Sequence, residues 1–196
     1  MRGPVHRRFL ILALGLLALG CWPNPSPAQS PAIGKSALDT AAPLLDQLKS
    51  ATDEAAARAL ESQVWLAWTG SGNDEVDGLM QRSSALMQAQ AFDEALAVLD
   101  GVVAKAPYFA EGWNKRATLL FMMSDYDRSM ADIGKVLALE PRHFGALSGI
   151  GLIRSARGDK LGAMAAYKKV LEIDPQNHAA KASIEAIGKE LEGNPI

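Results

Sequence analysis

The side chains best suited to catalysis or metal binding are few in this sequence and lie far apart. It contains three histidines, at 6, 143 and 178, and a single cysteine, Cys21. None of them forms a His-Glu-x-x-His or Cys-x-x-Cys zinc motif, and no Gly-x-x-x-x-Gly-Lys-Ser loop is present to bind nucleotide phosphates. Serines are plentiful, but none has a basic partner at a spacing that would activate it as a nucleophile. The sequence therefore predicts no catalytic residue, no metal site and no cofactor.

Two acidic pairs, Asp93 with Glu94 and Asp125 with Asp127, are the remaining candidates for a cation site. Each pair falls at the expected start of a helix, where carboxylates cap backbone N–H groups and meet the positive end of the helix dipole. The glycines within 149–151 do not form a dinucleotide-binding loop, because no strand precedes them. We interpret all of these residues as structural and predict that the protein is not an enzyme.

The composition narrows the kinds of partner. The 196 residues carry 20 Lys and Arg against 22 Asp and Glu, for a net charge of −2. Binding nucleic acid requires a clustered excess of basic side chains, which this sequence lacks, so we expect no nucleic-acid partner. Aromatic residues make up only 6% of the chain while good helix formers recur, which favours helix.

The N-terminal segment has the pattern of an export signal. Residues 1–8 are basic, and residues 9–19 form an apolar run. That run is shorter than the about 20 residues that a membrane-spanning helix needs, and it has the length of a signal-peptide core. No later stretch is long and apolar enough to span a membrane. We therefore expect an exported, periplasmic protein without a transmembrane span in its mature chain.

Two processing routes remain open. Cleavage after a small-x-small pattern would remove residues 1–28 as a signal peptide. Alternatively, Gly20 and Cys21 directly follow the apolar run and resemble the lipoprotein box of bacteria. Cleavage there would remove residues 1–20 and leave Cys21 with a lipid anchor. By either route the mature chain keeps at most one cysteine and forms no internal disulfide.

Self-similarity with a period of 34 residues is the strongest pattern in the sequence. Large, small and proline positions all recur at this spacing. The equivalent positions are Pro107, Pro141 and Pro175; Leu79, Trp113 and Leu147; Ser83, Ala117 and Gly151; Ala95, Ser129 and Ala163; Leu99, Ile133 and Tyr167; and Val102, Val136 and Val170. This period is typical of arrays of two-helix units. Small residues let two helices approach closely, and each proline prevents the second helix from continuing.

The pattern also predicts where the helices lie. First helices are expected near 77–89, 111–123 and 145–157, and second helices near 93–106, 127–140 and 161–174. Asn177 is the expected N-cap of a last helix over 178–191, whose polar back would keep the end of the array in water. Two further helices, over 35–50 and 53–68, are expected to form a hairpin that caps the N-terminal end of the array.

The repeated residues resemble the tetratricopeptide repeat family. The resemblance covers 76–177, and its best single repeat contains Trp113, Ala117, Asp125-Tyr126 and Leu139-Glu140-Pro141. It implies an all-α fold, a right-handed α-solenoid of helix-turn-helix hairpins. The expected segments are a Pro/Ser-rich tether at 29–35, an N-terminal helical hairpin at 36–70, repeats at 76–109, 110–143 and 144–177, and a C-terminal capping helix at 178–192. Arg82, Arg116 and Arg154 depart from the family pattern, which usually has apolar residues there.

The resemblance also implies where a partner would bind. In this family the first helices line a concave face that commonly holds a peptide or a helix. On that face the resemblance places Asp77, Met80, Ser84 and Met87; Glu111, Asn114, Thr118 and Phe121; and Ser148, Leu152 and Ser155. The alternative is that Met87, Phe121 and Met122 complete the core, since such residues at helical spacing usually pack inside.

Together these patterns predict a non-catalytic adaptor of the bacterial cell envelope that binds a protein or peptide through its concave face. The alternative is an envelope lipoprotein, anchored at Cys21, whose repeats scaffold a membrane-associated complex.

Overall fold

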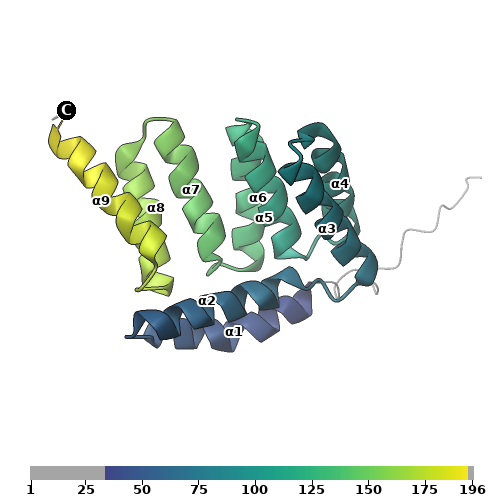
Figure 1. Cartoon of the computed structure of the whole chain (residues 1–196), viewed down its shortest axis with the longest axis horizontal. Coiled ribbons are helices and arrows are strands. Elements are labelled where there is room, and N and C mark those ends of the chain that lie inside the picture. The colour runs from purple at the N-terminus through teal and green to yellow at the C-terminus, as the bar shows by residue number, and fades with distance from the viewer. Residues whose placement is uncertain (1–33, 194–196) are drawn as a thin grey trace, which may run out of the picture.

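The structure, a computed structural model, describes residues 34–193. The predicted signal peptide, Cys21 and most of the predicted tether at 29–35 lie outside these residues. Throughout the described range the backbone forms helices and turns and contains no strand, which confirms the all-α prediction. Figure 1 shows the helices of the array standing side by side in sequence order.

Three hairpins form the repeat array. The first helices are α3 (Asp74–Gln88), α5 (Ala110–Met122) and α7 (Phe144–Ala156), and the second helices are α4 (Phe92–Lys105), α6 (Tyr126–Leu139) and α8 (Lys160–Ile173). Helix α9 (His178–Gly193) packs against α8 at the C-terminal end. The observed ends lie within three residues of the expected ones, because prolines and capping residues mark the ends in the sequence.

The turn inside each hairpin has the same backbone geometry. Gln90, Ser124 and Gly158 stand 34 residues apart and have φ values of 59°, 61° and 79°. This left-handed conformation ends the first helix and reverses the chain. The side chains of Asp125 and Asp159 then accept hydrogen bonds from backbone N–H groups of α6 and α8. The interpretation of Asp125 as a cap is therefore confirmed.

Small residues allow the two helices of a hairpin to touch. Ala95 and Ala163 are fully buried, and Ser129 donates a hydrogen bond of 2.7 Å to the carbonyl oxygen of Ala117. A Cβ atom added to Gly151 would lie 2.6 Å from the ring of Tyr167. The repeated small positions thus lie where the two helices of a hairpin touch, as the period predicted.

The N-terminal hairpin lies elsewhere than predicted. Helices α1 (Lys35–Ser50) and α2 (Glu54–Thr69) pack against each other, but they do not stack on α3 as an end cap. They run crosswise beneath the array, along the edge that holds the turns between repeats (Figure 1), and they contact α5 and α8. The prediction of an N-terminal cap is therefore wrong.

Aromatic side chains explain this placement. Trp68 is 1% exposed and stacks on the imidazole of His143, with ring centroids 4.0 Å apart. Trp65 meets His143 and Phe144 edge-on. A Cβ atom at Gly145 would lie 2.6 Å from the Trp65 ring, so a glycine there gives the indole room. The two tryptophans bury large apolar surfaces against the turn between α6 and α7 rather than against α3.

Candidate functional site

A small hollow opens between α5 and α7. Its lining residues are Asn114, Ala117, Thr118 and Phe121 of α5; Ser129 and Ile133 of α6; and Gly145, Ser148, Gly149, Leu152 and Ile153 of α7. The volume is about 100 Å³. Small-molecule sites usually have about 300–1,000 Å³, so this hollow suits a single side chain of a larger partner. Its walls are mostly apolar, and hydroxyl and amide groups lie at several points among them.

Glycine and alanine shape this hollow. A Cβ atom at Gly149 would lie 3.0 Å from the Cδ1 atom of Ile133, so the glycine lets α7 approach α6 closely. Ala117, at the repeated small position, is 3% exposed and leaves space between Asn114 and Phe121. Phe121 also packs on Tyr126, with ring centroids 5.6 Å apart, which fixes the orientation of its ring.

Asn114 is oriented by a buried carboxylate. Its amide nitrogen donates a hydrogen bond of 2.9 Å to Oε2 of Glu111, and this oxygen lies 3.4 Å from Nε2 of His143. Glu111 is only 6% exposed, so it supports Asn114 and does not belong to the open face as predicted. His143, on which Trp68 stacks, lies against this carboxylate. With one of its two N–H groups engaged by Glu111, Asn114 would meet a partner through its carbonyl oxygen or its second N–H group.

A second hollow, of about 360 Å³, lies where α2 meets α3 and α5. It is lined by Leu66, Thr69 and Gly70; by Asp77, Met80, Gln81 and Ser84; and by Lys115. Lys115 donates a hydrogen bond of 3.0 Å from Nζ to Oγ of Ser84, which links the first two repeats. Leu66 is 76% exposed at the rim. Sequence reasoning missed Leu66 and Lys115, because only the crossing of α2 brings Leu66 beside Lys115 of α5.

The predicted face is thus divided between two hollows. Asn114, Thr118, Phe121, Ser148 and Leu152 lie together in the first, and Asp77, Met80 and Ser84 lie in the second. Met80, however, is only 6% exposed and packs in the apolar cluster that contains Val76 and Leu99.

Two further predicted residues lie apart from both hollows. Met87 packs against the same apolar cluster as Met80, as the alternative interpretation proposed. Ser155 is exposed near the end of α7 and lines neither hollow.

Arg116 stands where the repeat pattern usually has an apolar residue, and the structure explains why an arginine fits there. Its Nε and Nη2 atoms each donate a hydrogen bond of 2.7 Å to Asp132, and Nη1 lies 2.7 Å from Asp100. The guanidinium also lies over the Trp113 ring, 4.9 Å from its centroid. The hydrogen bond with Asp132 raises the pKa of Arg116, although burial opposes the shift. An ion-pair network thus replaces the apolar contact usual at this position, and its partners lie 16 residues away on two second helices.

Residues 34–193 contain no group of three or more His, Cys, Asp or Glu that could hold a metal ion. None of the helices in this range is long and apolar enough to cross a membrane.

Comparison with known proteins identifies the family. Over 151 residues the chain is 38% identical to a TPR repeat-containing protein of Rhizobium etli, which is 77% of this chain and 74% of that relative. This chain belongs to the tetratricopeptide repeat family. The family model for the tetratricopeptide repeat matches residues 145–177, which fall on the third predicted repeat. Tetratricopeptide repeats generally serve as non-catalytic modules for protein–protein interaction.

Solved tetratricopeptide repeat structures share the fold. The first TPR of Spaghetti (RPAP3), bound to the HSP90 peptide SRMEEVD, has a TM-score of 0.57 and 23% identity and covers 61% of this chain and 94% of its own. The Sgt2 TPR domain of Aspergillus fumigatus has a TM-score of 0.57 and 23% identity, with coverage of 63% and 87%. The MamA protein has a TM-score of 0.54 and 21% identity, with coverage of 81% and 85%.

Proposed function

We propose that this tetratricopeptide repeat protein is an exported, non-catalytic adaptor of the bacterial cell envelope that holds a protein partner on the face formed by α3, α5 and α7. The observation that carries the proposal is the hollow between α5 and α7. Asn114 and Phe121 of α5 line it together with Ser148 of α7, and Leu152 is 47% exposed at its edge. A desolvated socket with a few polar groups is where the binding energy of an interface concentrates.

The chemistry of the face suits a peptide or a helix with one apolar anchor. The anchor would fill the hollow, while Asn114, Thr118 and Ser148 offer hydrogen bonds to its backbone. A structural neighbour, the first TPR of Spaghetti (RPAP3), is bound to a peptide, which supports a peptide-binding role for this fold.

A pull-down from the native envelope, followed by mass spectrometry, would identify the partner. Replacing Asn114 and Phe121 together by alanine should then weaken its binding by at least about 1–2 kcal/mol, with helicity by circular dichroism unchanged. A matched control replaces Lys135 and Lys168, two exposed residues of the second helices, by alanine and should leave the affinity unchanged. Full affinity in the Asn114/Phe121 variant would overturn the assignment of this face.

Export rests on the basic and apolar pattern of residues 1–19. The second candidate function, a lipoprotein that scaffolds a membrane-associated complex, is favoured by the position of Gly20 and Cys21 directly after the apolar run. Mass spectrometry of the protein from its native host separates the two. An N-terminus at Gln29 would support the soluble form, a lipid-modified Cys21 would support the lipoprotein, and an intact Met1 would contradict export.

A further inference from the structure

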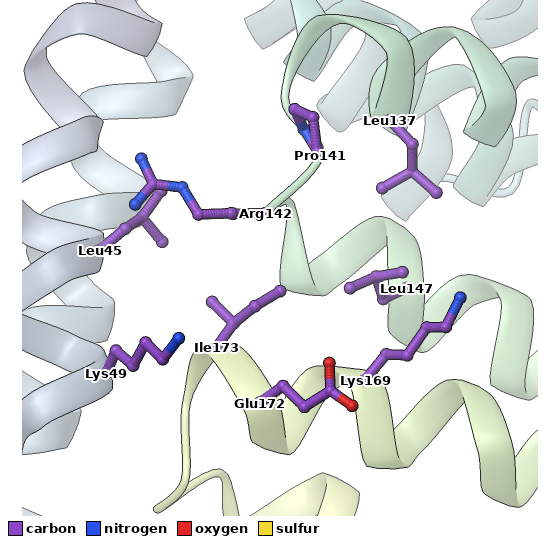
Figure 2. Close-up of a pocket in the computed structure, with 9 residues that line it drawn as sticks. All are labelled: Leu45, Lys49, Leu137, Pro141, Arg142, Leu147, Lys169, Glu172 and Ile173. Carbon is purple, nitrogen blue, oxygen red and sulfur yellow. The ribbon is translucent and has the colours of Figure 1, made fainter.

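A cavity of about 450 Å³ lies on the other side of the array, between α1 and the layer of second helices (Figure 2). Its lining residues are Leu45 and Lys49 of α1; Leu137 of α6; Pro141 and Arg142 of the following turn; Leu147 of α7; and Lys169, Glu172 and Ile173 of α8. Its volume falls within the range of about 300–1,000 Å³ found for ligand sites. None of these residues belongs to the hollows of the first-helix face.

The inner part of this cavity is apolar. Leu45 and Leu147 are 1% and 6% exposed, and Leu137 and Ile173 are half-buried. An aliphatic side chain placed against these four residues would lose contact with water on most sides, which is favourable at about 25 cal/mol per Å² of apolar surface buried.

The rim carries three basic side chains, and they differ in whether a carboxylate of the protein pairs with them. Arg142 reaches from the turn toward α1, where its Nη1 atom lies 2.7 Å from Oδ1 of Asp46, and its Nε atom lies 3.7 Å from Oε1 of Glu140. Lys49 extends from α1 toward Ile173 in Figure 2, and Lys169 stands on the wall formed by α8.

Within residues 34–193, the ion pairs of Arg142 have no counterpart at Lys49 or Lys169. Lys49 and Lys169 are both exposed to solvent, so their ammonium groups are available to an anion. The cavity thus combines an apolar floor with a rim on which Lys49 and Lys169 carry positive charge and Glu172 carries negative charge.

We propose that this cavity binds an acidic peptide segment in which a carboxylate side chain stands next to an aliphatic one. The aliphatic side chain would lie on Leu137 and Ile173. The carboxylate would meet the ammonium group of Lys49 or of Lys169, which lie on opposite sides of Glu172 in Figure 2. Glu172, which also lines the cavity, favours a peptide over a fatty acid. Its carboxylate can accept a hydrogen bond from a peptide N–H group, a donor that a fatty acid lacks.

Occupancy of this cavity would also hold the two parts of the molecule together. Leu45 and Lys49 come from the hairpin, and the other lining residues come from the array. A ligand that contacts both walls binds only the docked arrangement, so it stabilises the docking of α1 against the array. This site acts independently of the proposed partner face.

The probes for the test are three defined compounds. They are an acetylated and amidated hexapeptide of alternating glutamate and leucine, the equivalent peptide of lysine and leucine, and decanoate. Calorimetric titration of the purified protein should show saturable binding of the acidic peptide, tighter than that of the basic peptide by at least about ten-fold. Hydrogen exchange should show slower exchange of the α1 amides when the acidic peptide is bound.

Variants locate the binding. Changing Lys49 and Lys169 together to glutamate should weaken binding of the acidic peptide by at least about ten-fold. Lys168→Glu, on the same helix but outside the cavity, should retain the parental affinity within about two-fold, as should the Asn114/Phe121 double variant. The proposal is overturned if the basic peptide or decanoate binds as tightly as the acidic peptide. It is equally overturned if the Lys49/Lys169 reversal changes the affinity no more than Lys168→Glu does.

Discussion

The repeat array and the N-terminal hairpin hold their positions by different means. In the array each helix packs mainly on its neighbours in sequence, through small residues that recur every 34 positions. The hairpin instead packs on turns far along the chain. Asp46 pairs with Arg142, 96 residues away, and Glu61 accepts a hydrogen bond from Asn177, 116 residues away. A repeated pattern therefore specifies the array locally, whereas the hairpin depends on a few long-range contacts.

The largest expected effect on stability comes from breaking the aromatic contact between the hairpin and the array. Trp68→Ala removes a 1% exposed indole from the ring of His143 and should lower the free energy of unfolding by about 3–5 kcal/mol. Hydrogen exchange should accelerate more in α1 and α2 than in α5 and α6, because the hairpin loses its main contact with the array. Denaturant unfolding measures the total loss.

Leu66→Ala is the matched control for this variant, since Leu66 lies on the same helix but is 76% exposed. Its effect should remain within about 0.5 kcal/mol. Equal acceleration of exchange in all four helices of the Trp68 variant would mean that the hairpin and the array open as one unit.

A smaller effect is expected from a change inside the array. Gly151→Leu places bulk where an added Cβ atom already lies 2.6 Å from Tyr167, and it should cost about 1–3 kcal/mol by overpacking. Gly134→Leu is the control, because a Cβ atom there meets nothing within 4 Å. Thermal melts of both variants decide the matter. If they melt alike, the repeated small position is not a tight contact.

Contacts inside the array could be predicted from the sequence because each one is short-range and repeated. Asn177 was the expected cap of the last helix, and its Oδ1 atom accepts a hydrogen bond of 3.0 Å from Ala180 N. The left-handed turn residues were harder to predict, since only Gly158 among the three equivalent positions is a glycine. Gln90 and Ser124 adopt the strained conformation because the helices on both sides fix the turn.

The candidate site was predictable only in part, for the same reason. Asn114 and Phe121 lie two helical turns apart on α5, so their common stripe followed from helix geometry, and the hollow contains both. The burial of Glu111 depends on His143 and Trp68, and the place of Leu66 depends on the crossing of α2. Helix periodicity carries no information about such long-range packing.

The contribution to stability of the contact between α2 and the turn from α8 to α9 should depend on pH. Burial, together with a hydrogen bond and the charge of Asp174, raises the pKa of Glu61 from 4.5 to about 7, while Asn177 and Arg58 oppose the shift. Between these two pH values the folded state binds more protons than the unfolded state, so the free energy of unfolding should fall as the pH rises. Because Glu61 keeps contact with solvent, the expected decrease is only about 1 kcal/mol.

Glu61→Gln should abolish this decrease, as measured by denaturant unfolding at several pH values from about 4.5 to 8. Glu192→Gln, an exposed change on α9, should keep the parental profile. A Glu61 variant with the same pH profile as the parent would contradict the assignment.

The smallest effect is expected at the exposed ion pair between hairpin and array. Asp46→Asn removes the partner of Arg142, and since Asp46 is 76% exposed the loss should be about 0.2–1 kcal/mol. High salt should reduce the difference between parent and variant, because screening weakens exposed pairs. A loss as large as that of Trp68→Ala would show that charge, rather than aromatic packing, holds the hairpin in place.

The two ends of the hairpin meet at one point. The backbone N–H of Gly34 donates a hydrogen bond of 2.8 Å to the carbonyl oxygen of Ser71, just before α3 begins. Gly34 has a φ of 88°, and a Cβ atom there would lie 2.5 Å from Cα of Phe109, so only glycine allows this approach. Topologically, residues 35–70 form a closed insertion, because the chain enters and leaves the hairpin at the same point of the array. A deletion that joins Gly34 to Ser71 would therefore connect positions that are already adjacent, and the array would keep its chain path while it lost the apolar cover that Trp65 and Trp68 give to Phe144.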